Sequence, residues 1–272
     1  MSFALLPLAV VAAVVLLAAI GPAAAPYPPD AFVARPLLPP SAAHPLGTNA
    51  LGQDLLAQFL DGARPSVLAG AAGSALSTAL ALIVGLASAL GRRADALARA
   101  AADLFLAVPH LPLLILVVAL VGPSLPTIAV ALGLLSWPAF ARVVRAQART
   151  ELARGYVEAA RAIGASPARI LVRHVGPALL PVIAAKFVLT VQYVVLAEAS
   201  LAFLGLGDPT LVSWGGMVHR AMGYALIFAT PVWSWWLAPP VAGIALFVTS
   251  LALLGTVLDE RATPALRALR PR

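Results

Sequence analysis

The chain has 272 residues, of which 61% are hydrophobic and only 11% are charged, and it contains no cysteine. Soluble domains are about half apolar and about a quarter charged, so this composition excludes an ordinary soluble domain, and the lack of cysteine excludes disulfides, thiolate metal sites and a cysteine nucleophile. The formal net charge of +7 fits nucleic acid or an anionic membrane as partner, and its distribution along the chain decides between them.

Six apolar segments follow one another along the chain, at about 3–20, 66–90, 104–121, 126–144, 179–204 and 232–258. Each is about long enough to cross a bilayer as a helix, and short segments of alternating polarity, typical of membrane barrels, are lacking. The sequence therefore predicts an all-α polytopic membrane protein with about six transmembrane helices.

The first apolar segment has an alternative interpretation as a cleaved signal peptide, because residues 23–25 are all alanine and resemble a cleavage site. A signal peptide begins with a positive region, and the first basic residue here is Arg35. We therefore expect a retained span. It is followed by a proline-rich stretch at 21–45, which predicts an extended external loop.

The division that we expect is an N-terminal helix with its external loop at 1–65, a membrane domain at 66–260 and a tail at 261–272. The second span is rich in small residues, which allow membrane helices to approach closely. These small residues are Gly70, Gly73, Ser74, Ser77 and Gly85.

The arginines are distributed very unevenly between the two sides of such a protein. With the N-terminus inside, the outer side holds only Arg35, Arg64 and Arg220, and Lys186 lies near the inner end of the fifth span, where it can reach the interface. This asymmetry obeys the positive-inside rule, places both termini in the cytoplasm and explains the positive charge without nucleic acid. The inner set is Arg92, Arg93, Arg99, Arg142, Arg145, Arg149, Arg154, Arg161, Arg169, Arg173, Arg261, Arg267, Arg270 and Arg272.

The long inner loop at about 150–178 predicts two short helices. Gly164 suits the left-handed position that ends the first, and Ser166 followed by Pro167 is typical of an N-cap and the first position of the second. Ala159 and Ala160 give the first helix a narrow profile. Such a helix suits a groove on a partner protein, and an amphipathic helix lying at the lipid headgroups is the alternative.

This loop resembles the EAA loop in permease subunits of binding-protein-dependent ABC importers, and the residues that carry the resemblance are Glu158, Ala159, Ala160, Gly164, Ile170, Leu180 and Pro181. Patches at 44–54, 62–64, 137–145, 198–207 and 213–215 are similar to the C-type permease of the dipeptide, oligopeptide and nickel subgroup. The segment 208–212 is shorter and less proline-rich than in that subgroup, and a Gly-Asp-Gly pattern is reduced to Leu254-Gly255-Thr256.

The resemblance implies the ABC importer type I permease fold, with a MetI-like domain at 66–260. It implies that the inner loop couples the spans to ATPases, through Glu158, Ala159, Ala160, Gly164, Ser166 and Pro167. The implied partners are a second, different permease, two ATP-binding subunits that carry ATP and magnesium, and an extracytoplasmic solute-binding protein. The implied location is the bacterial plasma (inner) membrane, and the implied solute is a short peptide, with nickel or a metal chelate as the alternative.

The chain itself is not expected to hydrolyse ATP, because its only lysine, Lys186, precedes Phe187 and belongs to no phosphate-binding loop. No cofactor or metal is expected either, since the four histidines lack zinc-site spacing. An ion-driven transporter is a second class, but it favours an inverted repeat and several midplane charges. An intramembrane hydrolase is poorly supported, because no histidine or aspartate lies deep in a predicted span.

A few polar residues outside the loop are candidates for further roles. Glu198 is the only acidic residue deep in a predicted span, and it lines the translocation path or makes a structural hydrogen bond to a neighbouring helix. Gln192 is expected near the same face. On the outer side, contact with the binding protein is expected from Asp208, His219 and Arg220.

Two further groups are expected to be structural. Asp95 and Asp103 flank Arg99 four residues away on either side, which predicts ion pairs on a helix surface. Trp233, Trp235 and Trp236 are typical of an aromatic belt at the membrane interface.

Overall fold

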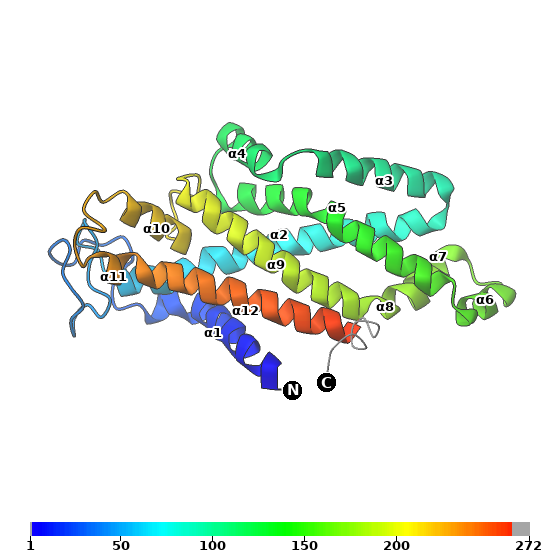
Figure 1. The fold of residues 1–272 in the computed structure, drawn as a ribbon, viewed down its shortest axis with the longest axis horizontal. Coiled ribbons are helices and arrows are strands. Elements are labelled where there is room, and N and C mark those ends of the chain that lie inside the picture. The colour runs from blue at the N-terminus through cyan, green and yellow to red at the C-terminus, as the bar shows by residue number, and fades with distance from the viewer. Residues whose placement is uncertain (1, 263–272) are drawn as a thin grey trace.

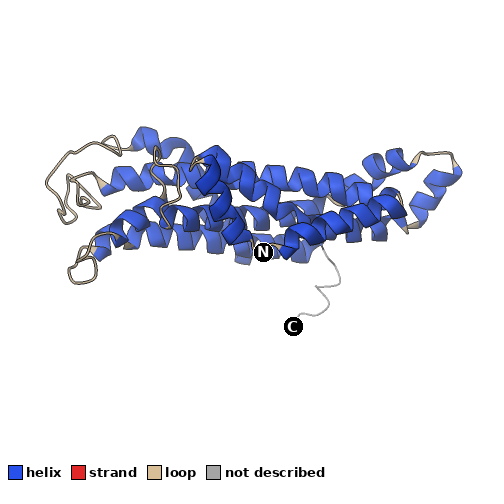
Figure 2. Ribbon diagram, turned by 90° about the horizontal axis from the view of Figure 1, so that it is seen from above, coloured by secondary structure: helices blue, strands red, loops and turns tan. Residues whose placement is uncertain are grey.

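A computed structural model of the chain describes residues 2–262 (Figure 1). The described part is helical, and its only β contacts are isolated bridges in the external loop, between Phe32 and Gln53 and between Thr48 and Asp54 (Figure 2). The helices are α1 (Ser2–Ala24), α2 (Leu55–Ala87), α3 (Arg92–Ala107), α4 (His110–Val121), α5 (Leu125–Leu152), α6 (Gly155–Ala162), α7 (Pro167–Ile170), α8 (Gly176–Ala178), α9 (Leu180–Phe203), α10 (Trp214–Met222), α11 (Trp233–Trp236) and α12 (Ala238–Ala262), with a 3-10 turn at Ser88–Leu90 and a π turn at Leu171–Val175.

The long helices lie side by side in one elongated bundle (Figure 1). One end of the bundle holds the loop 25–54 with α10 and α11, and the opposite end holds α6 and α7. Among the described residues, five helices are long and apolar enough to cross a membrane, and the bent pair of α3 and α4 makes a sixth if it counts as one span. The prediction of an all-α protein with about six spans is confirmed.

The third predicted span, 104–121, is wrong as a single helix. The chain bends by 81° between α3 and α4, at Val108 and Pro109. Val108 is extended, with φ −89° and ψ 131°, because a following proline disfavours the helical conformation, and Pro109 itself has no N–H to donate. The segment is apolar, as the sequence indicated, but Pro109 divides it between two helices.

Helix α2 lies at the centre of the bundle and begins eleven residues before the predicted 66. Asp54 caps it, accepting a 2.7 Å hydrogen bond from the amide of Ala57, and Pro65 is accommodated inside the helix. Its most extensive contact is with α5, where a Cβ on Gly133 would lie 2.9 Å from the carbonyl oxygen of Gly73. The small residues do bring helices into close contact, as the sequence indicated.

The external loop covers residues 25–54, so it begins and ends later than the predicted stretch 21–45 and is longer, and it is ordered by internal hydrogen bonds. Helix α1 continues through Pro22 to Ala24, and residues 25–54 fold back on the end of α2. The Thr48 hydroxyl donates to the carbonyl of Arg35 at 2.7 Å, and the Gln58 side chain donates to the carbonyl of Pro29 at 2.8 Å. Local polar side chains therefore replace the helical backbone bonds that the prolines prevent.

The three tryptophans of α11, at the same end of the bundle as the external loop, are in different environments. Trp233 is 47% exposed, as an aromatic belt predicts, but Trp236 is only 3% exposed and packs near Tyr224, with ring centroids 6.0 Å apart. Trp235 approaches Gly47 of the external loop. The belt prediction is therefore wrong for Trp236, which is buried in the apolar core at this end.

Candidate functional site

The inner loop forms the two short helices that its sequence predicts, and both turns have the expected chemistry. Gly164 has φ +84°, and a Schellman motif ends α6, with hydrogen bonds from Gly164 to the carbonyl of Arg161 and from Ala165 to that of Ala160, at 2.9 and 3.0 Å. Ser166 caps α7 by accepting from the amide of Arg169 at 3.3 Å, and Pro167 occupies the first turn. These bonds fix the angle between α6 and α7.

The two faces of α6 have different surroundings. Val157 and Ala160 are buried against the chain's own apolar core, while Glu158, Ala159 and Gly164 are exposed. Ser166 and Pro167 are also exposed. Ala160 is three residues after Val157, so the two share the buried face of α6. Ala160 therefore packs against the core and is not on the exposed face with Glu158.

Ile163, at the tip of this loop, was not among the residues that the sequence singled out. It is 87% exposed, which is unusual for an isoleucine beside polar residues. An apolar tip next to a capping glycine is the only sequence signal that marks it. A docked partner surface would bury this side chain.

Tyr156 connects the start of α6 to the end of α5. Its hydroxyl donates to the carboxylate of Glu151 at 3.0 Å, and its ring lies 6.2 Å from that of His174. Partial burial and this carboxylate raise the pKa of Tyr156 above its ordinary value, so the hydroxyl stays protonated and keeps donating. The loop is thus tied to α5 by a side-chain bond as well as by the chain.

Glu198 is enclosed within this chain. It is 2% exposed in α9 and accepts a 2.8 Å hydrogen bond from the hydroxyl of Ser66 on α2, and the Ser213 hydroxyl also reaches it. Gln192 is half-buried, and six residues of α-helix turn by about 600°, so the two side chains point about 120° apart. The expectation that Gln192 shares the face of Glu198 is wrong, and the geometry of Glu198 is that of a helix-to-helix hydrogen bond.

A different set of polar side chains faces outward from the bundle at membrane depth. A cavity of about 360 Å³ lies between the start of α4, the middle of α5 and the inner half of α9. We call it the α4–α5–α9 groove. Polar groups on an outward face of a membrane span mark a water-filled path or a protein contact rather than lipid. The polar residues that line it are His110, Ser136, Lys186, Thr190 and Tyr193, and the Tyr193 hydroxyl lies 3.5 Å from Nδ1 of His110.

Lys186 has a partner that the sequence did not predict. Its Nζ lies 2.8 Å from Oδ2 of Asp259, which links α9 to α12 near their inner ends. Both side chains are about a quarter exposed, at 25% and 28%. The expectation of a lysine that reaches the headgroups alone is therefore replaced by an ion pair between helices.

The three outer candidates are spread over different environments. His219 is exposed and its Nδ1 lies 2.7 Å from the carbonyl of Phe203, whereas two guanidinium nitrogens of Arg220 are buried without a partner among residues 2–262. This burial lowers the pKa of Arg220. Of these residues, His219 is presented to a partner and Arg220 largely is not.

Asp208 acts inside the chain. Its carboxylate accepts from the amide of Leu125 at the start of α5, at 3.0 Å, and from the amide and hydroxyl of Thr210. Burial alone would raise the pKa of Asp208, but the hydrogen bonds from Thr210 and Leu125 outweigh it and lower the pKa. The outer ends of α9 and α5 are joined through this residue.

We expect Asp208→Ala to destabilise the protein by about 1 kcal/mol, the cost of losing a helix cap. Because the folded pKa is lowered, this stabilisation is present above about pH 4 and disappears as the pH falls through the folded value. Thermal unfolding in detergent at pH 7 and at low pH measures it, with exposed Asp30→Ala as control. Equal melting temperatures for the two variants at pH 7 would contradict the capping role.

Comparison with known proteins gives one family. The profile described as "Binding-protein-dependent transport system inner membrane component" matches residues 77–268. A putative peptide transport system permease protein of Brucella suis is 37% identical over 230 residues, covering 82% of this chain and 75% of that protein. The di/tripeptide transport system permease protein DppC of Pseudomonas aeruginosa is 34% identical over 264 residues, covering 93% and 85%.

A solved structure supports the same fold. The match is to a chain of the MetNI methionine ABC transporter in an inward-facing conformation, with a TM-score of 0.56 and 19% identity, and it covers 79% of this chain and 97% of that one. At this identity the likeness concerns the fold alone.

Proposed function

The chain belongs to the family of binding-protein-dependent transport system inner membrane components and is a permease subunit of an ABC importer, and from this premise we propose that it forms half of a pore that imports short peptides. The names of its relatives support the solute: the Brucella suis protein is named a putative peptide transport system permease protein, and the Pseudomonas aeruginosa protein a di/tripeptide transport system permease protein. Nickel and metal chelates are not favoured.

The α6–α7 geometry carries the proposal. The pair projects beyond the bundle at one end (Figure 1), it is fixed by the Schellman turn, and it presents Glu158, Ala159 and the apolar tip Ile163. An exposed, pre-ordered helix suits a groove on a partner because little entropy is lost on docking. In an ABC importer, the partner at this position is a cytoplasmic ATP-binding subunit.

The orientation follows from charge. The end of the bundle with α6 and α7 holds Arg154, Arg161, Arg169 and Arg173, while Arg35 and Arg220 lie at the opposite end, so the α6–α7 end faces the cytoplasm. Both chain ends then lie in the cytoplasm, the membrane is the bacterial inner membrane, and ATP with magnesium binds on two partner subunits. A second permease completes the pore, and a solute-binding protein docks at the end that holds His219.

The α4–α5–α9 groove is this chain's share of the path for the solute. It replaces the path expected along Glu198 and Gln192, since Glu198 is enclosed by Ser66. Its hydroxyl and imidazole groups suit the amides of a peptide, because they both donate and accept hydrogen bonds.

We expect Ser136→Trp to reduce peptide uptake about tenfold or more, because an indole fills much of the groove. Val130→Trp is the matched control, because Val130 is on the same helix and its side chain is 50% exposed. We expect this variant to leave uptake within about twofold of wild type. Uptake per assembled complex in proteoliposomes is the measurement. Equal uptake by both variants would place the path elsewhere.

The function as a whole is tested by reconstituting the chain with its partner permease, ATP-binding subunits and binding protein in vesicles. ATP on the side of the membrane that holds α6 and α7 should drive accumulation, on that same side, of labelled di- and tripeptides that the binding protein binds. Accumulation driven by an ion gradient without ATP would refute the proposal, and accumulation of a nickel chelate in place of peptide would refute the solute.

A further inference from the structure

Asp95 is a buried carboxylate with an unusually dense set of partners. Its side chain is 7% exposed, and three arginines contact it: Arg99 on its own helix at 3.1 Å, Arg149 on α5 at 2.9 Å, and Arg145 on α5, which binds both carboxylate oxygens. The expected surface pair of Asp95 with Arg99 is therefore one part of a larger cluster.

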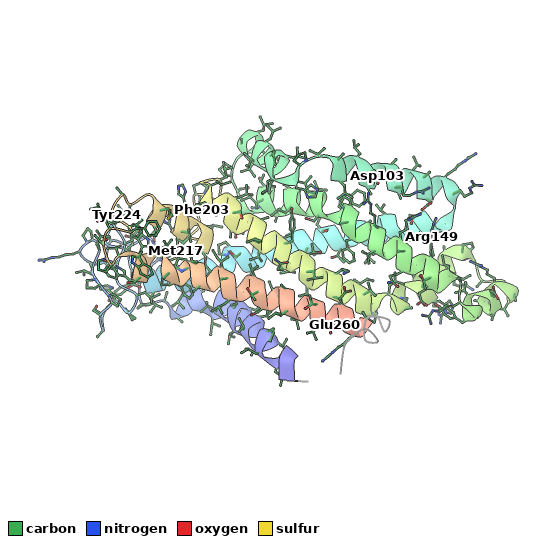
Figure 3. All side chains as sticks on the ribbon, in the orientation of Figure 1. Asp103, Arg149, Phe203, Met217, Tyr224 and Glu260 are labelled. Atoms are coloured by element: carbon green, nitrogen blue, oxygen red, sulfur yellow. The ribbon has the colours of Figure 1, made fainter. Side chains whose placement is uncertain are left out.

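A second acidic residue of α3 gives the natural comparison. Asp103 pairs with Arg142 of α5 at 2.6 Å and makes no pair with Arg99, but its side chain is 63% exposed and that of Arg142 is 53% exposed. Figure 3 shows Asp103 on α3 and Arg149 on the adjacent α5. An exposed pair of this kind contributes little, because solvent screens it. In the Asp95 cluster, Arg99 and Arg149 are exposed to the same degree as Arg142, at 55% and 52%, so the difference between the two sites lies in the covered carboxylate and in Arg145, which is 21% exposed.

The Asp95 cluster lies between α6, where an ATP-binding subunit is proposed to dock, and the α3–α4 bend beside the α4–α5–α9 groove. Arg145 and Arg149 lie in the last two turns of α5, and only residues 153 and 154 separate α5 from α6. A movement of α6 therefore reaches these arginines directly. At its other end, α3 terminates at the bend before His110, which lines the α4–α5–α9 groove.

We propose that Asp95 is a positioning residue that makes α3 move with α5, so that displacement of α6 changes the bend between α3 and α4 and the width of the groove. The proposal rests on the proposed function, since it needs ATPases that move α6. The attraction between the Asp95 carboxylate and the arginines of α5 links the two helices. Without the carboxylate, Arg99 of α3 and the arginines of α5 repel one another, so α5 can slide along α3 and α3 does not follow.

The first test compares Asp95→Asn with Asp103→Asn in the complete reconstituted importer. We expect Asp95→Asn to lower peptide uptake per ATP hydrolysed about tenfold, within the range of measured coupling energies, while Asp103→Asn stays within about twofold of wild type. Asp95→Glu keeps the charge and should recover part of the coupling. Equal coupling ratios for the two asparagine variants would overturn the proposal.

A distance measurement separates coupling from a merely structural role. The chain has no cysteine, so spin labels can be placed at Leu97→Cys on α3 and Thr150→Cys on α5, both exposed. In the wild-type background, with cysteine-free partners, the distance between labels should stay constant between nucleotide-free and ATP-trapped states. In Asp95→Asn it should change, and a constant distance in both backgrounds would overturn the proposal.

Failure of the proposed function gives a different result. If the wild-type complex accumulates no peptide, the solute assignment fails, but the label distances in the two nucleotide states still report whether α3 and α5 move together. If Asp95→Asn loses assembled complex, as judged by size-exclusion chromatography, while its remaining complex couples like wild type, Asp95 is structural only and the proposal is refuted.

Discussion

Gly164→Val is expected to reduce coupled transport about a hundredfold while the chain still inserts into the membrane and assembles. Gly164 has φ +84°, where a residue with a side chain loses about 1–2 kcal/mol and a β-branched residue more. Open space surrounds its Cβ position, so the cost comes from the backbone and not from a clash. Loss of this conformation breaks the Schellman bonds and releases α7 from its angle to α6.

The matched control for this position is Gly164→Asn, because asparagine tolerates the left-handed conformation that valine does not. We expect uptake by Gly164→Asn to remain within about threefold of wild type. Uptake by Gly164→Ala should lie between that of the asparagine variant and that of the valine variant. ATP-dependent peptide uptake and ATP hydrolysis by the same vesicles provide the measurement. Similar uptake by the valine and asparagine variants would show that backbone conformation at this turn does not matter for coupling.

The second large effect is expected at the crossing of α2 and α5. A Cβ at residue 133 would lie 2.9 Å from the carbonyl oxygen of Gly73 and 2.9 Å from the Cβ of Leu76. Since backbone atoms cannot yield as a flexible side chain does, Gly133→Leu forces the two helices apart and costs about 3 kcal/mol or more. The pair forms the most extensive helix contact in the bundle, so the folded protein should be lost.

Gly91→Ala is the control for this substitution. Gly91 has an extended backbone that any residue adopts, with φ 169°, and no heavy atom lies within 4 Å of its Cβ position. Monodisperse protein recovered from membranes and its melting temperature in detergent compare the two variants. Recovery of Gly133→Leu at the level of Gly91→Ala would mean that α2 and α5 do not pack at this point in the membrane.

Several expectations reached the correct residues because a local rule governs them. The end of α6 at Gly164 and the start of α7 at Ser166 and Pro167 follow from backbone preferences that a few neighbours decide. The small residues of α2 were recognised for the same reason, since a missing side chain permits close approach whatever the partner. The coupling role of Glu158, Ala159 and Gly164 remains a prediction.

Where expectations were wrong or incomplete, a contact between distant segments decided the outcome. Asp103 pairs with Arg142 of α5 and not with Arg99, four residues away, and Lys186 pairs with Asp259. Ala160 shares the motif with Glu158, but the core beneath α6 covers it. A sequence motif records which residues occur together and not which of them face the same way.

The sequence by itself determined that this chain crosses a membrane as helices, which end carries the positive charge, and where the α6–α7 turn lies, because hydropathy, charge and turn preference are properties of short segments. Only the tertiary structure decided that Glu198 is enclosed by Ser66 and that Asp95 gathers arginines from α5. These features join residues 50 and 132 positions apart, and such pairs depend on how the helices pack.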